Sequence, residues 1–468
     1  MLAQHTGMGM KAQIQEVALK PGIHRRSPWY GRIRWAAIRV FAAAVIGALS
    51  MASVSVANAD PPDPPGLQYQ EFYTPPDPLP PGKPGDLIRT EPSHLVLEPS
   101  GQLGAFVADG TRIMYRSTGA LGQPTAVTGT YFEPHNPWPG QGPRPLISYA
   151  VGMYGLGDQC APSRLFNQGI HFSSGLDIMP GYEETFIATM VARGFAIVVT
   201  DYEGMGTPAP APFGNRLSEA HVVIDAARAA MQLPGTSLEP NGPVAFWGWS
   251  QGGAASAAAA EMAPSYAPEL NLVGAWAGAP PADPSLLAPF ADGSIMMGVL
   301  GYILNGIIAA YPPAEAQIMP ILSVYGEDLV RRTRDQCIVE TGLTFGFHHL
   351  NEYFIPPPDE VFNNPQFKLV QDLQRIGTLK PKAPVYIESN RWDPVMPWHG
   401  ARQLAVDWCA KGADVELWTD YLHPFQNKLG MLHILSYFVD GERSMQWVAD
   451  RFNGVPTTPN CDSIPSPE

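Results

Sequence analysis

The stretch Pro243-Val-Ala-Phe-Trp-Gly-Trp-Ser-Gln-Gly-Gly253 decides the fold that the rest of the chain predicts. Its apolar run 244–247 is typical of a short buried strand, and the Ala-rich segment 253–261 is a strong helix former. Between them lies a G-x-S-x-G motif, and the order of strand, motif and helix predicts a nucleophile elbow. Glycine at 248 and 252 leaves room for the strained turn that lifts the Ser250 hydroxyl clear of a sheet. We therefore predict Ser250 as a nucleophile; the alternative is a Gly-Ser turn in an ordinary α/β unit.

A serine nucleophile needs donors for the oxyanion that forms on its substrate. The backbone N–H of Gln251, at the start of the following helix, is the first expected donor. The second is expected from the glycine-rich loop Gly152-Met-Tyr-Gly-Leu-Gly157, which follows the apolar run 145–151. Such a loop can also hold a phosphate, but it leads into Cys160-Ala-Pro without a helix start or a following lysine, so nucleotide binding is disfavoured.

The serine also needs a base and an acid, and on this fold both follow it in the chain. Asp393 fits the acid because it comes just after the apolar strand 384–388; the alternative is a helix-capping aspartate. Glu388 and Asp420 are weaker candidates because they lie within or at the end of strands. Spacing leaves the base open between His423 and His433. A third histidine, His399, opens a helix and is predicted to be structural.

Strand and helix patterns alternate along most of the chain. Apolar strand patterns lie at 112–116, 126–132, 145–151, 195–200, 244–247, 272–277, 384–388 and 415–418. Helix patterns lie at 183–193, 217–232, 253–261, 399–410 and 442–452. This order predicts an α/β fold with a doubly wound, mainly parallel sheet.

The alternation stops between 281 and 371. The segment 294–310 is almost continuously apolar but is interrupted by glycines, which favours a helical cap over an apolar pocket rather than a transmembrane helix. We divide the chain into a signal peptide, 1–59, and a Pro-rich arm, 60–98, which Phe72-Tyr73 would anchor. The core follows in two parts, 99–280 and 372–468, around a cap insertion, 281–371.

The chain has 468 residues and a net charge of −14. Its first 59 residues carry seven Lys/Arg against one acid and end in an apolar run closed by Ala57-Asn-Ala59. This predicts export with cleavage near Ala59, to the outside of the cell or to its envelope; the alternative is an uncleaved membrane anchor. So acidic an exported chain does not favour nucleic-acid binding. The four cysteines have no metal-type spacing and predict two disulfides, with three possible pairings.

With these residues in view, the chain resembles the secretory lipase family of the α/β-hydrolase superfamily. The resemblance extends over most of the exported part. Its stretches are Phe72-Tyr-Thr-Pro75, Cys160-Ala-Pro-Ser163, Tyr266-Ala-Pro-Glu-Leu-Asn-Leu-Val-Gly274, Asp393-Pro-Val-Met-Pro397, Cys409-Ala-Lys-Gly412 and Arg451-Phe-Asn-Gly454.

The resemblance implies a helical lid inserted after the nucleophile and hydrolysis of acylglycerols or other long-chain esters. It implies Asp393 and His433 as the acid and base and places Tyr154 in the second half of the oxyanion hole. It also implies disulfides between Cys160 and Cys337 and between Cys409 and Cys461.

We therefore expect a secreted serine carboxylic-ester hydrolase of the lipase or esterase type, working through an acyl-enzyme on Ser250. No metal or cofactor is expected, and the expected partner is a lipid or ester substrate with transient contact to a lipid interface. Two alternatives remain: an acyltransferase of the same fold, and a catalytically inactive hydrolase-fold protein that binds the cell envelope.

Overall fold

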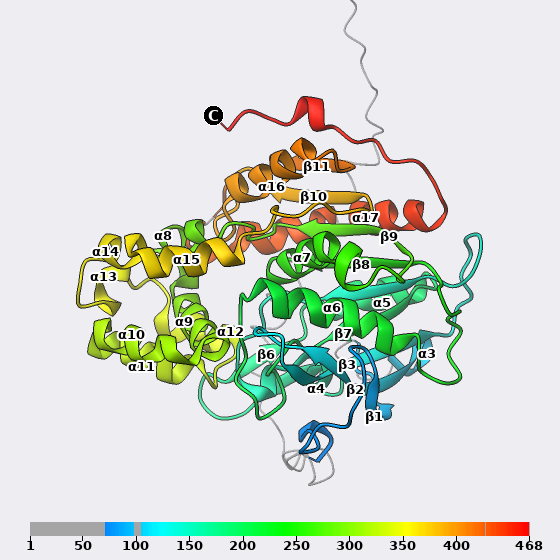
Figure 1. Cartoon of the computed structure of the whole chain (residues 1–468), viewed down its shortest axis with the longest axis horizontal. Coiled ribbons are helices and arrows are strands. Elements are labelled where there is room, and N and C mark those ends of the chain that lie inside the picture. Colours follow the sequence, from blue (N-terminus) through cyan, green and yellow to red (C-terminus); the bar gives the residue numbers. More distant parts are fainter. Residues whose placement is uncertain (1–70, 98–103, 426, 468) are drawn as a thin grey trace, which may run out of the picture. The chain divides into compact units, whose positions relative to one another are not determined.

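A computed structural model describes residues 71–97, 104–425 and 427–467, so the expected signal peptide lies outside the described residues. A nine-stranded sheet runs through it in the order β1-β2-β3-β7-β4-β8-β9-β10-β11 (Figure 1). The strands are β1 (Leu87–Ser93), β2 (Ala108–Thr118), β3 (Pro124–Pro134), β4 (Leu146–Ala150), β7 (Ala196–Thr200), β8 (Val244–Trp249), β9 (Leu272–Gly278), β10 (Val385–Asn390) and β11 (Val415–Asp420). The first three pair antiparallel, and all strands from β7 to β11 in this order are parallel.

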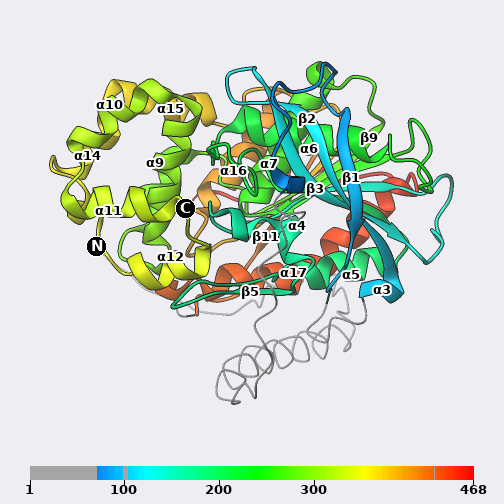
Figure 2. The same cartoon turned by 90° about the horizontal axis from the view of Figure 1, so that it is seen from below.

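Helices cover both faces of this sheet. Figure 2 shows α6 (Arg216–Ala230), α7 (Gln251–Tyr266) and α16 (Trp398–Ala410) on one face, with α5 (Glu184–Ala192) and α17 (Met431–Phe452) on the other. Of the six parallel strands, β4, β7 and β8 are buried along their whole length between these two layers, in keeping with their largely apolar sequences, whereas β11 at the edge alternates and leaves Trp418 exposed. The predicted doubly wound α/β fold is confirmed.

Three elements differ from the sequence prediction. Helix α17 begins at Met431, eleven residues before the predicted start at 442, so it contains His433 in its first turn. The prediction stopped short because Gly441 interrupts the pattern, but Phe186 packs there so closely that a Cβ on Gly441 would lie 2.3 Å from its ring. The other two were not predicted at all. They are β1, a half-exposed edge strand that contains Pro92, and a short hairpin of β5 (Ile170–Phe172) and β6 (Ile178–Pro180).

Residues between β9 and β10 form a helical cap. Its helices are α8 (Leu287–Ala291), α9 (Val299–Ala310), α10 (Glu315–Ile318), α11 (Val324–Thr333), α12 (Ile338–Phe345), α13 (Leu350–Tyr353), α14 (Pro358–Asn363) and α15 (Pro365–Gln374). They gather beside the sheet in both views (Figures 1 and 2). The cap has its own apolar cluster around Leu300, Leu304 and Leu329. Within the described part of the chain, no helix combines the length and apolar character needed to cross a membrane.

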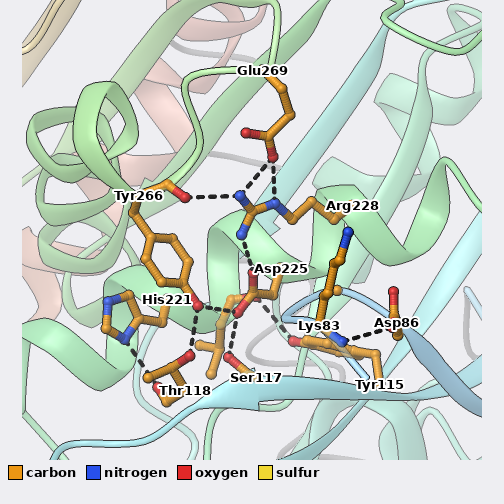
Figure 3. A network of polar contacts seen from close by, with 12 residues as sticks. Lys83, Asp86, Tyr115, Ser117, Thr118, His221, Asp225, Arg228, Tyr266 and Glu269 are labelled. Atoms are coloured by element: carbon orange, nitrogen blue, oxygen red, sulfur yellow. Dashed lines mark hydrogen bonds and ion pairs between the residues drawn. The ribbon is translucent and has the colours of Figure 1, made fainter. Parts of the chain in front are cut away.

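A buried carboxylate holds α6 against the edge of the sheet (Figure 3). Asp225 of α6 accepts hydrogen bonds from Ser117 of β2 at 2.7 Å and from Tyr266, the last residue of α7, at 2.9 Å. Arg228 pairs with the same carboxylate at 2.8 Å and with the exposed Glu269 at 2.6 Å. Burial raises the pKa of Asp225 to about 6, against the donors that lower it. This network joins β2, α6 and the end of α7.

Two disulfides connect distant segments. Cys160–Cys337 joins the loop after β4 to the cap just before α12, and Cys409–Cys461 joins α16 to the C-terminal segment. This is the pairing that the resemblance implied. At the other end of the chain, Phe72 and Tyr73 are buried, and the Tyr73 hydroxyl hydrogen-bonds Ser163 at 2.7 Å.

Peptide mapping without reduction should recover the 160–337 and 409–461 pairs. Replacing both Cys409 and Cys461 by serine should lower the free energy of unfolding by about 2–4 kcal/mol, because the unfolded chain regains the freedom of a closed loop. Denaturant unfolding of the variant beside the unreduced protein measures this loss. Equal midpoints, or a different connectivity, would contradict the assignment.

Candidate active site

Ser250 lies at the sharp turn between β8 and α7. Its backbone has φ 59° and ψ −121°, a conformation that a non-glycine residue rarely adopts. The turn is held from both sides, since the Ser250 N–H donates to the Gly278 carbonyl at 2.8 Å and the Ser250 carbonyl accepts from Ala254. This is the strained elbow that the motif predicted, and it presents the serine at the carboxyl edge of the sheet.

The glycines of the motif are required by close backbone approach. A Cβ on Gly252 would lie 2.0 Å from the carbonyl oxygen of Ala150, at the end of β4. A Cβ on Gly248 would lie 2.4 Å from the carbonyl oxygen of Gly252. Any side chain at either position would therefore push α7 away from the sheet and move Ser250.

The structure brings Asp393 and His433 together. His433 Nδ1 lies 2.6 Å from Asp393 Oδ2, and both side chains are buried. The other carboxylate oxygen of Asp393 accepts from the backbone N–H groups of Val395 and Met396, at 2.8 and 3.0 Å. The acid is thus fixed by its own turn and has one oxygen left for the histidine.

The second nitrogen of His433 contacts a residue for which the sequence predicted no role. His433 Nε2 lies 3.1 Å from the indole nitrogen of Trp249, the residue before the serine. Trp249 is buried and stacks on Tyr437, one helical turn beyond His433. Among the described residues, no side chain hydrogen-bonds the Ser250 hydroxyl.

The remaining acids and histidines weighed in the sequence lie elsewhere. Asp420 accepts from Asn390 and Leu422 and from Ser436 of α17, so it links strand ends to that helix. Glu388 is buried and accepts from the indole of Trp276. His423 is exposed and stacks on Trp392, and His399 contacts the carbonyl of Pro467.

The predicted oxyanion residues flank the turn. Gln251 is the first residue of α7, where a backbone N–H has no partner within the helix. Its side chain donates to Glu219 of α6 at 2.9 Å. Tyr154 is buried and stacks on Tyr182, while its neighbour Met153 lines the adjacent cavity. The loop that carries both is held to the cap by the Ile338 N–H, which donates to the Tyr154 carbonyl at 2.8 Å.

A buried glutamate connects this loop to the histidine's helix. Glu183 accepts from the Gly152 N–H at 2.9 Å, at the start of the loop. Its other oxygen accepts from Tyr149 of β4 at 3.1 Å and from Tyr437 of α17 at 3.0 Å. Burial raises the pKa of Glu183 to about 7, although these donors act to lower it.

An apolar cavity of about 120 Å³ lies between the core and the cap. From the core it is lined by Gln251, which follows the serine, and by Val395 and Met396, which follow Asp393. Most of its remaining wall is apolar and includes Ala288, Leu300, Ile303, Ile307, Phe362 and Phe367 of the cap. The buried Glu219 also reaches it, and burial raises the pKa of that carboxyl to about 7. The cavity suits an extended apolar group beside the serine.

A family model described as secretory lipase matches residues 171–460. The chain belongs to the secretory lipase family. The matched part contains the elbow, the cap, Asp393 and His433, so the family expected from the sequence is confirmed.

Relatives of this secretory lipase chain carry two kinds of description. It is 30% identical over 338 residues to a secreted triacylglycerol lipase of Malassezia furfur, covering 71% of this chain and 84% of that one. It is 26% identical over 387 residues to a probable inactive lipase of Mycobacterium tuberculosis, covering 83% and 82%. Candida antarctica lipase A in its closed state has a similar structure, with a TM-score of 0.70 at 22% identity over 88% of this chain and 91% of that one. This last likeness supports the α/β-hydrolase fold.

Sequence reasoning missed three polar residues around the serine: Trp249, Glu183 and Glu219. Trp249 was present in the motif, but the pattern says nothing about where its indole N–H points. Glu183 immediately precedes α5 and Glu219 lies in the first turn of α6, where acidic residues are expected from capping and the helix dipole alone. Only the packing of the helices against the sheet buries them.

Buried acids make the stability of this secretory lipase depend on pH. The pKa of Glu183 is higher in the folded protein, at about 7, than its ordinary value of 4.5, so folding binds a proton in between. This contribution is fully present below about pH 4.5 and is lost as the pH rises through about 7. Between pH 5.5 and 8.5 the loss is roughly 1–2 kcal/mol. Glu183→Gln should remove it, and thermal unfolding at both pH values measures the change.

The matched control is Glu360→Gln, which removes an exposed carboxylate from the cap. Its difference in Tm between pH 5.5 and 8.5 should equal that of the unsubstituted protein. If Glu183→Gln shows the same difference as well, Glu183 does not take up a proton on folding.

Proposed function

We propose that this chain is an exported serine carboxylic-ester hydrolase of the lipase type, which cleaves acylglycerols or other long-chain esters through an acyl-enzyme on Ser250. The observation that carries the proposal is the 2.6 Å contact of His433 with Asp393 beside a serine on a strained elbow. Membership of the secretory lipase family supports the same chemistry.

In the first half of the reaction, Ser250 Oγ attacks the ester carbonyl carbon while its proton passes to His433 Nε2. Asp393 holds the imidazole and stabilises the imidazolium. The Gln251 N–H and an N–H of the loop after β4, at Met153 or Tyr154, bind the oxyanion. The bond from carbon to the alcohol oxygen then breaks, and the alcohol leaves with the proton from His433. Water repeats the sequence on the acyl-enzyme and releases the carboxylic acid and free Ser250.

The cavity between the core and the cap would bind the acyl chain of the substrate. Its wall is mostly apolar away from Gln251 and Glu219, so a hydrocarbon chain that enters it loses contact with water, which stabilises it by about 0.8 kcal/mol per buried CH₂. Exposed apolar side chains occur on the cap, at Val324, Tyr325 and Ile355, and on the β5–β6 hairpin, at Phe172. They support transient contact with a lipid surface.

Export is the remaining part of the proposal. The family and the Malassezia furfur relative are described as secretory or secreted, which supports an extracellular place for this chain. The signal peptide 1–59, with cleavage near Ala59, is our own assignment. The mass of the mature protein recovered outside the cell tests it.

Replacing Ser250 by alanine should abolish labelling by an alkyl phosphonate and lower ester hydrolysis by at least about 10⁴-fold, because no other group forms the acyl-enzyme. His433→Ala should do nearly the same, and Asp393→Asn should be severe because the amide favours the wrong imidazole tautomer. Mass spectrometry of the labelled protein and hydrolysis of p-nitrophenyl esters measure these losses. His423→Ala, at an exposed site, is the matched control and should keep its activity.

If the unsubstituted protein is not labelled at Ser250, the hydrolase proposal fails and the alternative of an inactive hydrolase-fold protein is favoured; the mycobacterial relative is described as a probable inactive lipase. If His423→Ala is inactive and His433→Ala is active, the base has been assigned to the wrong histidine.

Filling the cavity should shorten the acyl chain that the enzyme accepts. Ala288→Phe adds a ring to the cap wall of the cavity, so kcat/KM for a C12 or C16 p-nitrophenyl ester should fall by about tenfold or more. The C2 and C4 esters should change by less than about threefold. Leu343→Phe, at an exposed position of α12, is the control for the same ring on the cap surface. An equal loss for all chain lengths would remove the acyl chain from this cavity.

A further inference from the structure

The two nitrogens of His433 are both engaged, and neither contacts the serine. Nδ1 lies on Asp393, and Nε2 lies 3.1 Å from Trp249 Nε1. An indole nitrogen can only donate, so Nε2 must carry the lone pair and Nδ1 the proton. This is the tautomer that a general base needs, but its single lone pair is occupied by a residue other than Ser250.

We propose that Trp249 is a positioning residue that holds His433 in a resting position, from which the imidazole must move to Ser250 for each attack. This inference rests on the proposed function, because it concerns the base of the same reaction. Trp249 and Ser250 are consecutive in the chain, so two neighbouring donors compete for one acceptor.

The movement belongs to the histidine, since the indole is fixed. Trp249 is buried and stacks on Trp276 and Tyr437. It also packs on the backbone of Gly278, where a Cβ would lie 2.3 Å from its ring. His433, in contrast, lies in the first turn of α17. The residue just before this helix is Gly430, whose φ is +68°. To reach the Ser250 hydroxyl, the imidazole rotates about its side-chain bonds away from the indole N–H, while Nδ1 keeps its contact with Asp393.

The same contact limits where the imidazolium can form. Once Nε2 has taken a proton it can no longer accept from the indole, and two N–H groups would face each other. The protonated histidine therefore leaves the resting position. Trp249 thus stabilises the neutral histidine in the resting position and cannot hold the protonated one.

Three states follow: resting neutral, working neutral and protonated. Only the working neutral state attacks. Let f be the ratio of all neutral histidine to the working neutral form. Removing the resting state raises the rate of attack by Ser250 at high pH by this factor. It also moves the midpoint of the curve of that rate against pH upward by log f. At low pH the protein with the resting state and the protein without it react at the same rate, because the protonated state dominates in both. A neutral hydrogen bond of ordinary net strength gives f of about 2 to 12.

The other charged groups near α17 are the same in the unsubstituted protein and in a variant that lacks the Trp249 indole. Asp393 is the one ionisable side chain that hydrogen-bonds His433 among the described residues. The ionisable groups on elements packed around it include Glu183 before α5, Glu388 on β10, Asp420 on β11, Lys428 before α17, and Tyr437, Asp440 and Arg443 on α17. None of them hydrogen-bonds Trp249 within the described structure, so Trp249→Phe removes none of their hydrogen bonds.

The test is Trp249→Phe, which keeps an aromatic ring and removes the indole donor. The second-order rate of Ser250 labelling by a soluble alkyl phosphonate is measured from pH 5 to 9. We expect a plateau about 2 to 12 times higher, a midpoint displaced upward by the logarithm of the measured factor, and superimposed rates at the acid end. Trp247→Phe is the matched control: Trp247 lies two residues earlier on β8, is equally buried and donates to Ser444. Its curve should keep the midpoint of the unsubstituted protein.

An unchanged curve for Trp249→Phe would overturn the proposal. So would a change of plateau without the linked change of midpoint, since loss of packing alone would lower the rate at all pH values.

If Trp249→Phe does not fold, the unsubstituted protein carries the test. With ¹⁵N-labelled tryptophan, the indole N–H signal of Trp249 should shift over the pH range in which the labelling rate changes, and this pH-dependent signal should be missing from His433→Ala. The absence of such a signal overturns the proposal. Failure of the proposed function looks different: the unsubstituted protein would then not be labelled at Ser250 at all, while the NMR titration would still decide the contact between Trp249 and His433.

Discussion

The contact of α7 with the end of β4 is the constraint on which the site depends. The backbone of Gly252 approaches the Ala150 carbonyl so closely that a Cβ would lie 2.0 Å from it. Because α7 starts this close to the sheet, the chain must turn sharply at Ser250, in a strained conformation that the surrounding hydrogen bonds impose. The same contact brings the Gln251 N–H beside the loop that follows β4. Nucleophile and oxyanion donors are therefore placed by one piece of backbone packing.

The parallel arrangement of β4, β8, β10 and β11 does the rest of the assembly. Their carboxyl ends meet at one edge of the sheet, and each is followed by a segment that supplies one part of the site. The loop after β4 faces the oxyanion, β8 ends at Ser250, and the turn after β10 carries Asp393. The chain beyond β11 returns as α17, whose first turn carries His433. The catalytic groups are far apart in the sequence, and it is the parallel order of the strands that brings them together.

Features set by local sequence could be predicted, whereas features set by the packing of distant segments could not. The elbow, the strand order and Asp393 follow from local rules: an apolar run, a G-x-S-x-G turn, and an acid just after a strand. The start of α17 could not be read in this way, because Gly441 breaks the helix pattern and only the packing of Phe186 shows why a glycine belongs there. The same is true of the Trp249 indole and of Glu183, whose roles depend on which surfaces the folded chain buries.

Base and oxyanion loop are joined by more than their common edge of the sheet. Glu183 accepts hydrogen bonds from the Gly152 N–H and from Tyr437, and Tyr437 stacks on Trp249, which in turn contacts His433. A buried carboxyl whose pKa is near 7 holds one end of this chain of contacts. When it loses its proton, the same donors must stabilise a full charge, and their hydrogen bonds shorten and strengthen. The positions of the oxyanion loop and of the helix that carries the base are then set together, by one side chain that touches neither substrate nor serine.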